Sequence, residues 1–170
     1  MTASCVKLYS LEYRQPRTYL VAALFALGNI ALPQLCHLAH LGGPTWLPIY
    51  FFTLVAAYKF GWRAGLLTAV ASPLANALLF GMPTAAMVPA ILLKSVVLAL
   101  VAGRTAARFG RVSLWLLTGV VLTYQTIGTL GEWALLGDFR AAAQDFRLGL
   151  PGMALQVFGG WAVVRHLIRK

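Results

Sequence analysis

Six long apolar runs, separated by short polar segments, dominate the chain. They cover residues 18–36, 46–60, 64–80, 85–103, 113–136 and 149–168. None of the runs alternates apolar and polar residues with a period of two, and each is too long for a strand of a membrane barrel. A spanning helix needs about 20 mostly apolar residues. The pattern therefore predicts an all-α integral membrane protein, with residues 1–170 forming a single domain of six transmembrane helices.

The composition supports a membrane protein. Hydrophobic residues make up 60% of the chain and charged residues 11%, whereas soluble domains carry about 25% charged residues. The chain cannot cover a water-soluble globule with polar groups, and it is too apolar for a disordered tail. The first seventeen residues are polar and mixed, and the first apolar run is too long for the core of a signal peptide, so we expect no cleavable signal.

The basic residues predict the orientation in the membrane. Fourteen Lys and Arg face four Asp and Glu, and they lie between apolar runs, which is not the pattern of a nucleic-acid-binding face. With six spans, Arg140 and Arg147 fall on one side and eleven basic residues on the other: Lys7, Arg14, Arg17, Lys59, Arg63, Arg104, Arg108, Arg111, Arg165, Arg169 and Lys170. Positive residues favour the cytoplasmic side. We therefore expect both termini in the cytoplasm.

One charged side chain is expected deep inside a span. Lys94 lies about nine residues into the fourth apolar run, where a lysine costs about 2.5–3.5 kcal/mol on insertion scales. Such a residue normally faces a cavity or a partner. Two interpretations remain open and are compatible: an ion pair with Glu132, near the outer end of the fifth run, or a contact to an anionic group of a ligand.

Further polar groups are expected to converge in the outer half of the membrane. Spacings of four and three place Gln125, Thr129 and Glu132 on one face of the fifth helix. The other candidates for substrate binding are Tyr124, Trp133, Asn29, Asn76, Gln156, His37, Trp46 and Tyr50. Each polar group alone is explained by a helix–helix hydrogen bond, but the group as a whole predicts a pocket open to the outside.

The sequence contains no pattern for catalysis. His37 and His40 form a pair without a nearby Cys, Asp or Glu, which is a weak metal signal. There is no H-E-x-x-H motif, phosphate-binding loop or G-x-S-x-G motif. We therefore expect no enzyme activity, no metal and no cofactor.

The stretch from Pro48 to Gly103 resembles the substrate-binding S components of energy-coupling factor (ECF) transporters, which are small six-helix vitamin binders. About a third of the chain carries the motifs. They are Pro48-Ile49; Gly61-Trp62-Arg63-Ala64-Gly65 followed by Ser72-Pro73-Leu74; Phe80-Gly81-Met82-Pro83; Met87-Val88-Pro89; and Leu100-Val101-Ala102-Gly103. Many members of that family carry an acidic residue at the position of Lys94, so the pocket charge differs in this chain.

The resemblance implies partners and a mechanism. It implies import of a vitamin or related small molecule through a membrane-embedded T subunit, energised by two cytoplasmic ATPase subunits. It also implies a protein of the cytoplasmic (inner) membrane of a prokaryote. In that family a small-x-x-x-small patch on the first helix docks on the T subunit, and Ala22 and Ala26 match it. It also implies a pocket near the outer surface, covered by residues 37–46 and 81–85.

An alternative of another class stays open. The rod-shape-determining scaffold protein MreD is similar in size, number of spans and basic character, and it binds no ligand. A scaffold needs neither an intramembrane Lys94 nor a polar cluster in one leaflet, so a ligand pocket distinguishes the two hypotheses.

Overall fold

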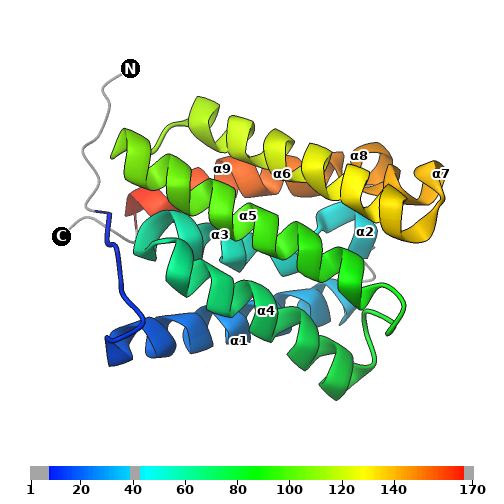
Figure 1. Ribbon diagram of the computed structural model, residues 1–170, viewed down its shortest axis with the longest axis horizontal. Helices are drawn as coiled ribbons and strands as arrows, with labels where there is room; N and C mark the ends of the chain where they lie inside the picture. The colour runs from blue at the N-terminus through cyan, green and yellow to red at the C-terminus, as the bar shows by residue number, and fades with distance from the viewer. Residues whose placement is uncertain (1–7, 39–42, 167–170) are drawn as a thin grey trace.

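The computed structural model describes residues 8–38 and 43–166, and every regular element in these two ranges is a helix (Figure 1). The long helices are α1 (Pro16–Leu38), α3 (Pro48–Phe60), α4 (Trp62–Phe80), α5 (Val88–Phe109), α6 (Leu114–Leu136) and α9 (Leu150–His166). The short ones are α2 (Gly43–Trp46), α7 (Phe139–Ala142) and α8 (Gln144–Leu148). The all-α prediction is confirmed for the described ranges.

Four helices, α1, α4, α5 and α6, are long and apolar enough to cross a membrane. The chain is therefore a multi-pass helical membrane protein. Helix α3 is apolar but only 13 residues long, and α9 is described over 17 residues, against the about 20 residues that a perpendicular span requires. The number of six spans therefore stays a prediction.

The expected second run, 46–60, is divided at Leu47. This residue has a φ of 46°, in the left-handed region, and Pro48 then opens α3. A proline is accepted in the first turn of a helix but cannot continue a preceding one. The segment 137–147, expected as a loop, forms α7 and α8, and Asp138 caps α7 by accepting from the backbone N–H groups of Arg140 and Ala141.

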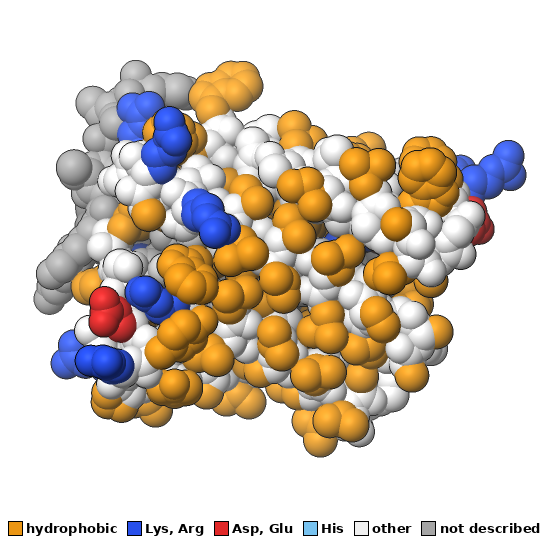
Figure 2. Space-filling view, viewed as in Figure 1, with side chains coloured by type: hydrophobic (Ala, Val, Ile, Leu, Met, Phe, Trp, Pro, Cys, Tyr) orange, Lys and Arg blue, Asp and Glu red, His pale blue; other side chains and the backbone are white. Residues whose placement is uncertain are grey.

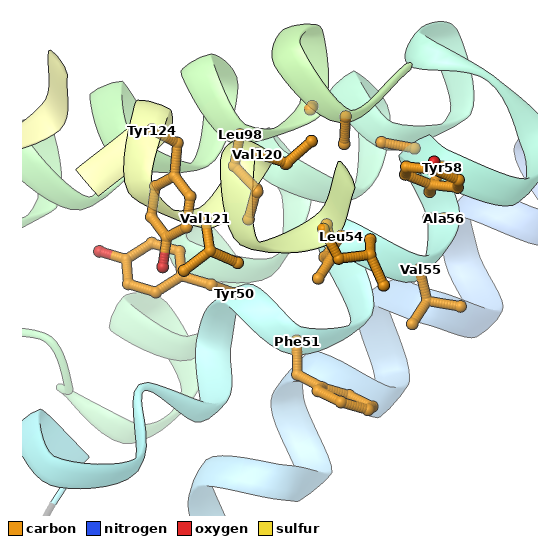
Figure 3. Packing of buried hydrophobic residues seen from close by; sticks show 14 of the residues in the cluster. Tyr50, Phe51, Leu54, Val55, Ala56, Tyr58, Leu98, Val120, Val121 and Tyr124 are labelled. Atoms are coloured by element: carbon orange, nitrogen blue, oxygen red, sulfur yellow. The ribbon is translucent and has the colours of Figure 1, made fainter. Parts of the chain in front are cut away.

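Helix α3 is the buried centre of the bundle, in contact with α1, α4, α5 and α9. Its stretch from Leu54 to Tyr58 is at most 1% exposed, because none of its faces reaches the surroundings. Figure 3 shows this row of side chains, with Tyr58 at one end and Tyr50 beside Tyr124 of α6 at the other. The short helix thus sets the spacing of the longer ones around it.

Buried hydrogen bonds join α1 to α3 and α4. The Asn29 amide nitrogen donates to Thr53 Oγ1 (2.9 Å) and Ser72 Oγ (3.2 Å), and Asn29 Oδ1 accepts from the Phe52 N–H at 3.0 Å. Thr68 Oγ1 donates to the Ala22 carbonyl at 3.3 Å. In an apolar bundle, where water is not at hand as a partner, such bonds between helices fix their register.

The two ends of the bundle differ in charge. Figure 2 shows Lys and Arg gathered at the end where α1 begins and α5 ends, while hydrophobic side chains cover the middle of this face. The described basic residues at that end form the basic cluster: Arg14, Arg17, Lys59, Arg63, Arg104, Arg108, Arg111 and Arg165. The opposite end carries α2, α7, α8 and the connection between α4 and α5 (Figure 1).

Close helix packing at glycines gives a test of this arrangement. A Cβ on Gly103 of α5 would lie 2.6 Å from the Trp62 Cα, so Gly103→Ala must push backbones apart at a cost of about 1–3 kcal/mol. Gly119→Ala, in the second turn of α6, meets nothing within 4 Å and should be neutral or slightly stabilising. The measurement is the thermal unfolding midpoint of both variants in detergent, and equal midpoints would contradict the packing of α4 on α5.

Candidate functional site: a cavity with a buried lysine between two carboxylates

A cavity of about 310 Å³ lies at the end of the bundle away from the basic cluster. Its wall is built from the last turns of α1, the first turns of α3, α4 at Asn76, α5 at Ile91 and Lys94, and α6 at Glu132. The rim comes from the connection between α4 and α5 and from α7 and α8. This volume falls within the range of small-molecule sites, about 300–1,000 Å³.

Lys94 is the central charged group of the cavity. It is 2% exposed, and its Nζ forms ion pairs with Glu132 Oε2 of α6 and, at 2.7 Å, with Asp145 Oδ2 of α8. A Cβ on Gly128 would lie 2.4 Å from the Lys94 Cγ. The glycine therefore lets the lysine stem cross α6 and reach both carboxylates.

Five of the residues predicted to bind substrate line the cavity: His37, Tyr50, Asn76, Lys94 and Glu132. The ion pair between Lys94 and Glu132, one of the two interpretations that the sequence left open, is formed. Those five residues come from five different helices. The predicted convergence of several helices on one end is thus present for this part of the set.

Other predicted residues lie behind the cavity wall and do not line it. Asn29 is fully buried and its hydrogen bonds join α1 to α3 and α4. Tyr124 donates its hydroxyl to Gln156 Oε1 at 2.8 Å, and its ring lies 5.6 Å from that of Tyr50. These residues match the helix–helix interpretation, and Tyr124 packs beside Tyr50 of the cavity wall (Figure 3).

Gln125, Thr129, Trp46 and Trp133 also lie outside the cavity lining. Gln125 is fully buried, and neither its amide nitrogen nor its oxygen has a hydrogen-bond partner among the described residues. The Thr129 hydroxyl has none there either. Trp133 is 46% exposed and packs edge-on against Phe139 of α7.

Asp145 is the functional candidate that sequence reasoning missed. A buried lysine needs counter-charges, and only four acidic residues exist in the chain. Three of these four, Glu132, Asp138 and Asp145, lie close together in the sequence. This clustering was the signal that could have indicated a second partner for Lys94. The apolar lining residues Met82, Met87 and Ile91 carried no signal beyond their place in or beside a predicted span.

The small residues of α1 have a defined place. Ala22 and Ala26, the predicted docking pair, are 5% and 8% exposed and face the bundle interior. The exposed face of α1 is formed by Leu20, Ala23, Leu24 and Leu27. A partner approaching α1 from outside therefore meets this second set first.

No group of three His, Cys, Asp or Glu residues that could hold a metal ion occurs within residues 8–38 and 43–166. His40, one member of the weak histidine pair, lies outside the described residues. Comparison with protein families, characterised proteins and solved structures finds no match to the chain.

The buried ion cluster makes a prediction about stability. Lys94→Met leaves the buried Glu132 and the half-buried Asp145 without their shared partner, and breaking a buried ion pair in this way costs about 3–5 kcal/mol. Adding Glu132→Gln and Asp145→Asn to this variant removes the unpaired charges and should recover most of the loss. Thermal unfolding in detergent measures both variants. A triple variant as unstable as Lys94→Met would show that the charges are not the cause.

Proposed function

We propose that the protein is the substrate-binding S subunit of an ECF-type importer that captures a vitamin or related small molecule from outside the cell. The observation that carries the proposal is the cavity of about 310 Å³ around Lys94, at the bundle end away from the basic cluster. Because basic ends favour the cytoplasm, this end faces the outside. The proposal includes six spans, with both termini in the cytoplasm of a prokaryote.

The proposed energy source lies in other subunits. The chain carries no phosphate-binding loop motif, and the family that it resembles uses a membrane-embedded T subunit with two cytoplasmic ATPases. Transport then requires the bundle to carry its loaded cavity to the T subunit. Helix α1 is the best docking element, because only 17% of its most apolar stretch is buried within this chain.

The cavity also bears on the scaffold alternative. A MreD-like scaffold has no use for a cavity with a buried charge, which costs stability in an apolar medium. Groups with such a cost are usually retained for function in membrane proteins. The buried Lys94 beside an open cavity therefore favours ligand binding over a purely structural role.

Filling the cavity tests ligand binding directly. Ala141 of α7 lines the cavity, and a tryptophan there occupies the space of a ligand. We expect wild-type protein purified from cells to retain a small molecule detectable by mass spectrometry and Ala141→Trp to lose it. Ala134→Trp, on an exposed position of α6 outside the cavity, should retain it. Identical small-molecule content in all three proteins would contradict the proposal.

Enlarging a residue on the α1 surface tests partner docking. Ala23 is exposed, so Ala23→Trp should stop co-purification of the T and ATPase subunits from native membranes in mild detergent, while the small molecule stays bound. Ala154→Trp, at an exposed position of α9, is the control and should keep the partners. Recovery of equal amounts of ATPase with both variants would place the docking surface elsewhere.

A further inference from the structure

The charged groups of the cavity do not balance. Lys94 contributes one formal positive charge, and Glu132 and Asp145 contribute two negative ones. No other Lys, Arg, Asp or Glu lines the cavity among the described residues, where His37 is the one remaining titratable group besides Tyr50. Arg140 and Arg147 of α7 and α8 are exposed and lie outside the lining. The cluster therefore has a formal charge of −1 at neutral pH.

The carboxylates also keep free acceptor atoms. Lys94 contacts Glu132 through Oε2 and Asp145 through Oδ2, and neither Glu132 Oε1 nor Asp145 Oδ1 makes a hydrogen bond to any described residue. A carboxylate accepts several hydrogen bonds, and those from a charged donor are about twice as strong as neutral ones. Both remaining oxygens are thus suited to a cationic donor.

Asn76 adds an acceptor of fixed orientation. Its amide nitrogen donates to the carbonyls of Asn29 (3.1 Å) and Ser72 (3.0 Å), which uses both amide hydrogens. Asn76 is 1% exposed, and its Oδ1 has no partner among the described residues. A donor on a bound molecule would satisfy this buried oxygen, whose isolation is otherwise costly.

We propose that the molecule held in this cavity is a small cation with an apolar body, carrying an ammonium or amidinium group that binds between Glu132 and Asp145. The group restores neutrality in the cluster, and the apolar body packs on Tyr50, Met82, Met87 and Ile91. This inference rests on the proposed function and narrows its substrate class. The sequence left an anionic ligand group open as a partner of Lys94, and the second carboxylate, Asp145, argues against it.

A matched pair of probes tests the sign of the charge. Tryptamine and indole-3-acetate share an aromatic ring and differ in carrying an ammonium or a carboxylate. A ligand that binds the folded protein raises its unfolding midpoint. We expect tryptamine to raise the midpoint of the purified wild-type protein in detergent and indole-3-acetate to leave it unchanged. Ala141→Trp, which fills the cavity, should abolish the tryptamine effect.

Two substitutions with the same change in net charge locate the effect. Asp145→Asn makes the cluster neutral and should weaken tryptamine binding about tenfold. Asp138→Asn is the control, because Asp138 caps α7 outside the cavity lining and asparagine caps a helix equally well. Its tryptamine affinity should equal that of the wild type.

Several results would overturn the charge preference: indole-3-acetate binding as tightly as tryptamine, no effect of either probe, or equal loss in Asp145→Asn and Asp138→Asn. A tryptamine effect that survives in Ala141→Trp would also overturn it, since the probe would then bind outside the cavity. The proposed function is judged separately. A co-purified anionic molecule that Ala141→Trp loses would overturn the charge preference and support ligand capture.

Discussion

Burying one ammonium group in an apolar bundle is the constraint on which the cavity end of this protein depends. Lys94 is 2% exposed, and its charge is tolerated because Glu132 and Asp145 reach it from two other helices. An uncompensated charge at such a depth is expensive. The positions of α5, α6 and α8 are therefore linked through one nitrogen atom, and the cavity lies where these helices meet.

The rest of the bundle is organised around the short helix α3. Its stretch from Leu54 to Tyr58 is buried on all sides. Asn29 of α1 forms hydrogen bonds to α3 and also to Ser72 of α4. At the cavity end of α3 the Tyr50 ring packs beside that of Tyr124, whose hydroxyl donates a hydrogen bond to Gln156. Several polar residues thus support the cavity wall without lining the cavity. They are distinct from the lining residues, which can touch a ligand.

Much of the helical fold follows from hydrophobic runs in the sequence, because each helix must be apolar enough for a membrane. The runs at 64–80 and 113–136 differ from α4 and α6 by at most two residues at either end. The helices α7 and α8 were missed, since short polar segments carry no periodicity. The turn at Leu47 was missed because it falls inside an apolar run. Lys94 and Glu132 were predictable as costly intramembrane charges. Asp145 was not, because its role depends on how α8 folds back over the bundle.

The position of α8 over the bundle also bears on which ligand charge the cluster accepts. Helix α8 has only five residues and no buried side chain, so its own packing holds it weakly. The bond from Lys94 to Asp145 crosses from the bundle to this rim helix. Because a lysine with two carboxylate partners leaves one negative charge uncompensated, a cation entering beside them adds attraction for the rim without breaking that bond. An anion must compete with both carboxylates for the Lys94 nitrogen. If it displaced Asp145, the bond that holds α8 to the bundle would be lost.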